Sequence, residues 1–317
     1  MTALAFSPKP LSLPDVPNPG MITEDEEKLY VTLAHDFWQP DRTYLEIGTW
    51  LGRSTQRICQ GLEERAPGAW HLHCYDRFLW HETHVPKAER GGWPEPVRDL
   101  RPGDSFRDAF LSLMGPYRGR ISAHTGNLDE IGTVMRGVLS DRDRLGVLFV
   151  DASKGWNNVY LLRFAAPFLA HEGQASRVVF QDFFMWSAYK LHFLLMLTPA
   201  LEPESYVKKG GSLVFRVTGP LNENQTSFRK MPNQLTREQI HNAWSRLTSA
   251  IPEDRLAKQA LHVSLPLMLW HCGYHDDAFA EMRRAPLTDV GMQRIRARAK
   301  LNPDLWIPPI RERVELR

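Results

Sequence analysis

Short apolar runs alternate with stretches of helical spacing over most of residues 25–218. The runs have the length of strands, and the stretches between them carry apolar residues three or four positions apart, as amphipathic helices do. Strands are expected at about 43–47, 70–76, 121–125, 144–151 and 176–182, with a terminal hairpin at 206–208 and 212–217. Helices are expected from Thr23 to before Pro40 and at about 54–65, 104–114, 156–169 and 186–197. Strands that alternate with helices predict an α/β fold with a parallel sheet.

The pattern differs at the two ends of the chain. Residues 1–20 hold five prolines and little periodicity, whereas the segment after Thr218 is first polar and then reads as helices to about Leu301. We therefore expect a Pro-rich extended arm at 1–24, an α/β domain at 25–220 and a helical extension at 221–317. Two capping boxes, Thr-x-x-Glu at 23–26 and Thr-x-x-Gln at 236–239, predict where two helices begin.

Composition narrows the class of protein. The chain has 317 residues, of which 43% are hydrophobic and 24% are charged, as in soluble globular proteins. A net charge of +2 gives no electrostatic case for nucleic acid or an anionic membrane. Three cysteines, far apart in the sequence, favour neither a disulfide framework nor a Cys-x-x-Cys metal site. Without a leader pattern or a membrane-spanning run, we expect a cytoplasmic protein.

A glycine turn follows the first strand. Glu46 stands just before it, and Gly48 and Gly52 are four residues apart at the start of a helical pattern. Glycine lets a ligand approach bare backbone, and the helix that follows offers unpaired N–H groups to a polar ligand. An ordinary glycine-containing strand-to-helix turn would give the same pattern.

The segment Glu46-Ile-Gly-Thr-Trp-Leu-Gly52 resembles the first motif of class I S-adenosylmethionine (SAM) methyltransferases. The resemblance implies a Rossmann-like sheet with helices on both faces and a glycine turn that cradles the methionine part of SAM. Asp76, at the end of the second strand, would accept the ribose hydroxyls, and Asn127 would meet the adenine; a strand-end cap and a turn asparagine are the alternatives. Residues that the resemblance implies for SAM binding are Glu46, Gly48, Thr49, Gly52, Ser54, Asp76, Arg77, Asn127 and Asp151.

Two further acids end consecutive core strands. Asp151 and the pair Gln181-Asp182 resemble the metal ligands of O-methyltransferases of the catechol and macrolide-sugar types, and oxygen ligands suit Mg²⁺. Those families commonly carry two adjacent acid or amide ligands there, and the neutral glutamine of this pair weakens such a site. Alternatively, Asp151 shapes its loop and Asp182 caps the next helix.

Lys154 follows Asp151 by three residues, as in the catechol-type enzymes, where the lysine is the base. A partly buried lysine beside a cation loses its proton more easily and could deprotonate a hydroxyl that Mg²⁺ orients. Macrolide-sugar enzymes carry histidine there, and a solvated surface lysine is the alternative.

Residues 77–103 interrupt the α/β rhythm and leave the same strand end as Asp76, so we expect a lid or substrate-recognition insertion. His81, Glu82 and His84 allow a metal site, but no third ligand at a defined spacing supports it, and surface histidines on a loop are the simpler interpretation. Aromatic residues expected to stack on an acceptor are Trp80, Trp93, Phe183, Phe184 and Trp186.

Three functions follow as hypotheses. The first is a SAM-dependent methyltransferase that acts on a hydroxyl of a small molecule, such as a sugar, a polyketide or another natural product, with Mg²⁺ and Lys154. The second is a metal-independent N-methyltransferase. The third is a non-catalytic SAM-fold protein that acts through its helical end. A homodimer formed through the helical end is a hypothesis that the sequence leaves open.

Overall fold

The structure, a computed structural model, describes residues 3–7, 13, 20–82, 94–140, 143–222, 226–251, 255–301 and 303–315. The chain forms two compact units. The parallel-sheet unit comprises Phe6–Ala152 and Pro167–Val179, and the hairpin unit comprises Met1–Ala5, Ser153–Ala166 and Phe180–Arg317. The expected domain boundaries at residues 24 and 220 stay predictions.

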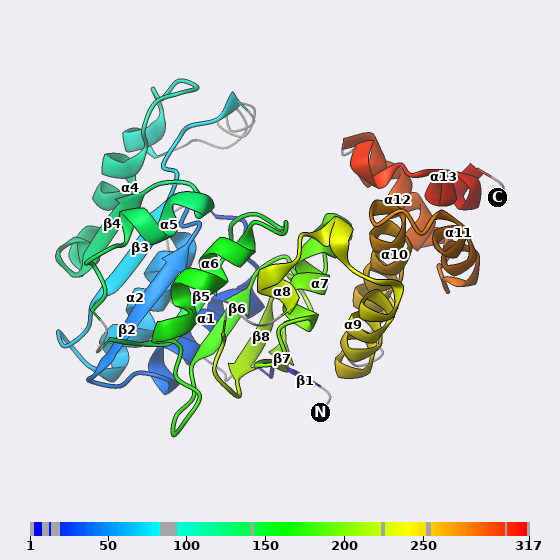
Figure 1. The fold of residues 1–317 in the computed structure, drawn as a ribbon. Coiled ribbons are helices and arrows are strands. Elements are labelled where there is room, and N and C mark those ends of the chain that lie inside the picture. Colours follow the sequence, from blue (N-terminus) through cyan, green and yellow to red (C-terminus); the bar gives the residue numbers. More distant parts are fainter. Residues whose placement is uncertain are drawn as a thin grey trace. The chain divides into compact units, whose positions relative to one another are not determined.

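Four parallel strands form the core of the parallel-sheet unit (Figure 1). Strand β2 pairs with β3 on one side and with β5 on the other, and β4 pairs with β3. Each strand lies where the apolar runs predicted one, and β5 is buried along nearly its whole length, as its unbroken run requires. The bounds are β2 Arg42–Ile47, β3 Leu72–Asp76, β4 Ile121–Thr125, β5 Arg144–Val150 and, across the unit boundary, β6 Arg177–Phe180.

Helices α1 (Glu24–Asp36) and α2 (Arg53–Arg65) pack closely on each other. The capping box of Thr23 and Glu26 begins α1, as predicted. Close approach of the two helices depends on Gly61, where an added Cβ would lie 2.3 Å from the Val31 carbonyl oxygen. Two shorter α-helices lie in the described part of this unit, α4 Arg107–Leu113 and α5 Ile131–Val134.

The hairpin unit contains α6 (Asn158–Ala165), α7 (Tyr189–Met196) and the antiparallel pair β7 (Leu201–Tyr206) and β8 (Leu213–Val217). The predicted second arm of the hairpin is confirmed, but the first arm precedes its predicted place at 206–208. Pro203 and the polar residues beside it hide the strand alternation of β7. The expected extended arm contributes β1 (Leu4–Ala5), which pairs in parallel with the end of β7.

From Arg237 the described segment is mainly helical, as predicted, whereas a short helix at Thr226–Arg229 lies in the stretch that was expected to be polar and loop-like. Thr236 and Gln239 form the second predicted capping box, and α9 and α10 pack together (Figure 1). The bounds are α8 Thr226–Arg229, α9 Arg237–Ala250, α10 Arg255–His271, α11 His275–Arg284, α12 Asp289–Leu301 and α13 Pro308–Glu315. Among the helices that the structure describes, none is long and apolar enough to cross a membrane.

Strand order in the sheet is β1-β7-β8-β6-β5-β2-β3-β4. From β2 the chain continues to its neighbour β3 and later returns to β5 on the other side of β2. The carboxyl ends of these three strands therefore form a topological switch point, where open α/β sheets bind ligands. The fold is α/β and Rossmann-like, as predicted.

Candidate functional site

Three carboxylates gather at this switch point, all in the parallel-sheet unit. Glu46 is the penultimate residue of β2, Asp76 is the last residue of β3, and Asp151 directly follows β5. Main-chain hydrogen bonds hold the strand ends together: Asp151 N donates to Ile47 O at 2.7 Å, and Gly48 N donates to Tyr75 O at 2.9 Å. The sequence placed these acids at one sheet edge, and the register confirms it.

The glycine turn has left-handed backbone at three positions, with φ of 81° at Gly48, 48° at Trp50 and 87° at Gly52. A Cβ on Gly48 would lie 2.0 Å from the carbonyl oxygen of Asp151, and one on Gly52 would lie 2.0 Å from Cε of Met114. The glycines are thus required by the turn's conformation and by the protein atoms beside it. Ligand approach, the reason inferred from the sequence, is not needed to explain them.

Glu46 is 2% exposed and lies beneath this turn. The hydroxyls of Ser54 and Thr55 donate to its two carboxylate oxygens at 2.5 and 2.6 Å, so Ser54, expected to bind cofactor, contacts Glu46. Burial raises the pKa of Glu46 to about 7, the two hydroxyls oppose the rise, and the negative charges of Asp151 and Asp76 add to it. A cation at this site would therefore favour the ionised carboxylate.

Asp76 accepts hydrogen bonds from the main chain of Trp50, Phe78 and Thr49. The N–H of Trp50 donates to Oδ2 at 3.2 Å, and the N–H of Phe78 donates to Oδ1 at 2.9 Å. Burial raises the pKa of Asp76 in spite of these donors, and the nearby charge of Asp151 acts in the same direction. The main-chain donors fix the orientation of the carboxylate at the mouth of the turn, and each oxygen keeps acceptor capacity for a ligand hydroxyl.

Thr49 carries a polar atom that the protein does not satisfy. Its side chain is 1% exposed, and within the described part of the chain its hydroxyl oxygen is buried without a hydrogen-bond partner. Buried polar groups are nearly always paired, so such an atom marks a place for a ligand or water. The cluster of acids and this hydroxyl fit a cationic ligand that also carries polar groups.

Two predicted residues lie at the margin of the site. Arg77 follows Asp76 and is exposed. Asn127, one strand further along, caps a short helix: its main-chain N–H and its side-chain amide donate to Glu130 Oε2 at 2.8 and 3.0 Å. Asn127 thus has a local structural role, as the alternative of a turn asparagine implied, and the adenine contact stays a prediction.

The predicted base and two predicted metal ligands belong to the hairpin unit, whereas Asp151 belongs to the parallel-sheet unit. Lys154 Nζ lies 3.9 Å from Asp182 Oδ2, so the ammonium pairs with an expected magnesium ligand. Asp182 has a left-handed backbone with φ of 54°, and Gln181 is 3% exposed. In the described ranges no three His, Cys, Asp or Glu side chains form a metal-binding group.

The two ends of the predicted insertion at 77–103 are held close together and well packed. Leu79 bridges to Ser105 in antiparallel fashion, and the rings of Trp50 and Trp80 stack at a centroid distance of 5.7 Å. Trp80 is 1% exposed and Phe183 is 0% exposed, so the prediction that these rings stack on an acceptor is wrong. Both rings are core residues, as large aromatics commonly are. His84 and Trp93 lie outside the described residues.

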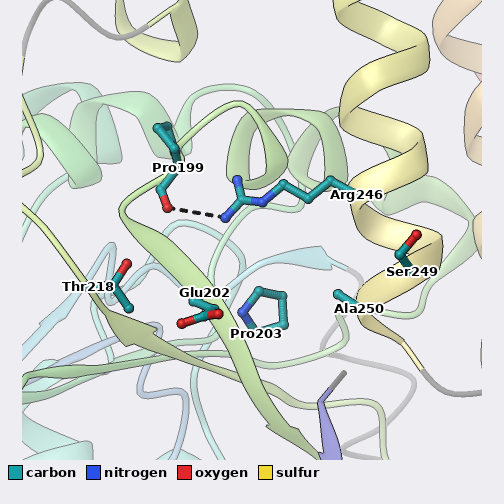
Figure 2. A pocket seen from close by; sticks show the side chains of 7 residues that line it. All are labelled: Pro199, Glu202, Pro203, Thr218, Arg246, Ser249 and Ala250. Carbon is teal, nitrogen blue, oxygen red and sulfur yellow. Dashed lines mark hydrogen bonds between the residues drawn. The ribbon is translucent and has the colours of Figure 1, made fainter. Parts of the chain in front are cut away.

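A cavity of about 290 Å³ opens elsewhere in the hairpin unit (Figure 2). The guanidinium of Arg246 donates there to main-chain carbonyls between the end of α7 and the start of β7, including those of Pro199 and Leu201. This arginine therefore closes the turn after α7. The lining residues are Pro199, Glu202, Pro203, Thr218, Arg246, Ser249 and Ala250, none of which the sequence singled out.

Sequence reasoning missed two residues of the site, Thr55 and Trp50. Thr55 follows Ser54 at the start of α2. A helical projection of this segment would have placed its side chain on the face toward β2, which is the signal that could have found it. Trp50 acts through its main-chain N–H, for which the residue type gives no signal.

No family model matches the chain, and no curated protein matches it. Several solved structures, however, are similar to the chain. The chain is similar to cofactor-bound Rv0187 from MTB, with 18% identity over 64% of this chain and 84% of that one and a TM-score of 0.42. It is similar to an O-methyltransferase from Bacillus cereus in complex with SAH, with 16% identity over 62% and 82% and a TM-score of 0.43. It is also similar to CalS11, a TDP-rhamnose 3'-O-methyltransferase of calicheamicin biosynthesis, with 13% identity over 60% and 76% and a TM-score of 0.41. At these identities and TM-scores the likenesses carry no argument about activity.

Proposed function

We propose that the protein is a SAM-dependent methyltransferase that acts on a small molecule. The observation that carries the proposal is the group of three carboxylates around the glycine turn, at the switch point of the sheet. Burial and mutual repulsion raise the pKa of both Glu46 and Asp76, so the site favours a ligand that brings positive charge. SAM carries a sulfonium and an ammonium, and the first supplies an electrophilic methyl group.

The residues of the turn divide the binding between them. Glu46 would hold the ammonium end from below, and Thr49 would offer its hydroxyl to the same end. Asp76 would accept the ribose hydroxyls, with Trp50 and Phe78 fixing its carboxylate from the main chain. These contacts position the donor, and positioning supplies much of the rate of a transfer between two bound molecules.

For the acceptor we propose a hydroxyl of a sugar, a polyketide or another natural product. Lys154, in its neutral form, would take the hydroxyl proton on Nζ while the oxygen forms its new bond to the methyl carbon and the carbon–sulfur bond breaks. Asp182, 3.9 Å from Lys154 Nζ, would then stabilise the ammonium that results.

Magnesium assistance, with Asp151, Gln181 and Asp182 as ligands, remains part of the proposal. The donor atoms are of the kind that Mg²⁺ takes, and a bound ion would orient the acceptor hydroxyl and lower its pKa. The pairing of Lys154 with Asp182 supports the competing candidate, a metal-independent transferase, because an ammonium then neutralises the carboxylate that the ion would use.

Labelled methyl transfer to a panel of hydroxyl and amine acceptors tests the proposal. Transfer by the native protein, and its loss by at least about a hundredfold in Lys154→Met with SAH binding retained, would support a hydroxyl acceptor and a lysine base. Glu172→Gln is the matched control, because that side chain is 92% exposed and outside the site. A protein that binds SAH but methylates no member of a broad panel would favour the non-catalytic alternative.

A further inference from the structure

A buried histidine in the hairpin unit has no part in the proposed chemistry. His192 lies on α7 and is 0% exposed. Burial lowers its pKa to about 4, although its hydrogen bond to the main chain of Phe183 opposes the change, so the imidazole is neutral at pH 7. A buried, neutral histidine needs a partner for each ring nitrogen.

Both partners are present. Nε2 contacts the carbonyl oxygen of Phe183, and Nδ1 lies 2.8 Å from the hydroxyl oxygen of Ser264 on α10. Because a carbonyl oxygen only accepts, Nε2 carries the proton and donates to Phe183, and Nδ1 accepts the hydroxyl proton of Ser264. Ser264 is 0% exposed as well, so both side chains that form the two hydrogen bonds are buried.

Phe183 directly follows Asp182 in the turn after β6. The ring of His192 also packs on the ring of Phe183, with centroids 4.6 Å apart. Asp182 holds a left-handed conformation, which a non-glycine residue keeps only when its surroundings fix it. The Met185 N–H closes the same turn by donating to the Asp182 carbonyl at 3.0 Å.

We infer that Ser264 and His192 are positioning residues: through Phe183 they hold the turn that presents Asp182 to Lys154, so helix α10 of the C-terminal region is a structural part of the acceptor site. The functional half of this inference rests on the proposed methyl transfer. The structural half rests on the buried hydrogen bonds alone. It gives the helical region a role in a site to which it contributes no reacting group.

Three variants weaken to different degrees the relay, that is, the two hydrogen bonds that link Ser264 through His192 to Phe183. His192→Phe keeps an aromatic ring and removes both hydrogen bonds, Ser264→Ala removes one, and His192→Gln supplies an amide N–H for the Phe183 carbonyl. Ser227→Ala is the matched control: Ser227 is also 0% exposed and accepts the Thr198 hydroxyl at 2.8 Å in the same unit, but its bond does not reach the turn.

Hydrogen exchange of residues 181–185, followed by mass spectrometry without substrate, is the primary measurement. Loss of a buried hydrogen bond should speed exchange of the turn by about tenfold in His192→Phe, less in Ser264→Ala, and little in His192→Gln. The same variants should lose turnover in that order, with the SAH dissociation constant within about twofold of the native protein. A turn that exchanges as in the native protein in both His192→Phe and Ser264→Ala would overturn the inference, as would equal acceleration in Ser227→Ala. Because exchange needs no turnover, this result is separate from the fate of the proposed methyl transfer.

Discussion

The surroundings of Glu46 act in opposite directions on its protonation state. Its carboxylate is buried beside two other acids, yet two hydroxyls donate to it. The hydroxyls favour the ionised form, and burial and the neighbouring charges favour the neutral one. A pKa of about 7 means that small changes at the site, such as an arriving cation, decide the protonation state.

This balance predicts a pH dependence of stability. The ordinary pKa of a glutamate is about 4.5, and that of folded Glu46 is about 7, so the folded state holds the extra proton between these values. The free energy of unfolding should therefore fall as pH rises from about 4.5 to about 7, by up to about 3 kcal/mol from this residue. Glu46→Gln lacks the titration, and urea unfolding at several pH values would show the difference. A constant gap between the two proteins from pH 5 to 8 would contradict the prediction.

Gly48 tests the turn itself. Gly48→Ala places a Cβ 2.0 Å from the Asp151 carbonyl oxygen at φ of 81°, so the backbone must move. We expect a loss of at least about 3 kcal/mol in the free energy of unfolding, measured with urea. Gly173→Ala is the control, because Gly173 has φ of 61° with no atom near its Cβ, and only about 1–2 kcal/mol is expected there. Equal losses in the two variants would show that strand-end crowding is absent.

At the scale of elements, the α1–α2 pair supports the glycine turn, because α2 begins at Arg53 where the turn ends. Glu27 on α1 forms two ion pairs: its Oε1 lies 2.6 Å from Arg53 Nε, and its Oε2 lies 2.6 Å from Arg57 Nη2. The Glu27 and Arg57 side chains are only 4% and 3% exposed. Breaking such a buried pair leaves an uncompensated charge.

Glu27→Ala should therefore lower the free energy of unfolding by about 3–5 kcal/mol, as read by chemical denaturation. The exposed pair of Glu24 and Lys28 on the same helix is the comparison, since Glu24 is 75% exposed. Glu24→Ala removes that pair and should change stability by less than about 1 kcal/mol. If Glu27→Ala were as mild as Glu24→Ala, the pair would not hold the helices together.

The elements that the sequence predicted well are those whose signal is local. Unbroken apolar runs predicted β5, and capping boxes predicted the starts of α1 and α9. The first arm of the hairpin was misplaced because Pro203 interrupts its alternation, and the two-residue strand β1 has no local signal because its pairing with β7 is tertiary.

The same distinction explains the site. Strand-end acids can be predicted, because a strand run and a parallel sheet fix where its last residue lies. The main-chain contact of Trp50, the burial of Trp80 and the relay from Ser264 to Phe183 depend on how distant segments pack. No periodicity in the sequence encodes such contacts.

At the scale of the whole molecule, the metal hypothesis names Asp151, Gln181 and Asp182 as the ligands of one ion. If Mg²⁺ assists, a chelator should lower methyl transfer by at least about tenfold, and added Mg²⁺ should restore it. Asp151→Ala should then be as inactive as the chelated native protein. Full activity in the presence of chelator would instead mean that Asp182 pairs with Lys154 and binds no ion, as in a metal-independent transferase.

Calorimetric titration of the native protein with SAM and with SAH tests the central claim most directly. The account predicts one site per chain, and about a tenfold or greater loss of affinity in Asp76→Asn with the fold unchanged by circular dichroism. Glu172→Gln should bind as the native protein does. A well-folded native protein that takes up neither SAM nor SAH would contradict the account.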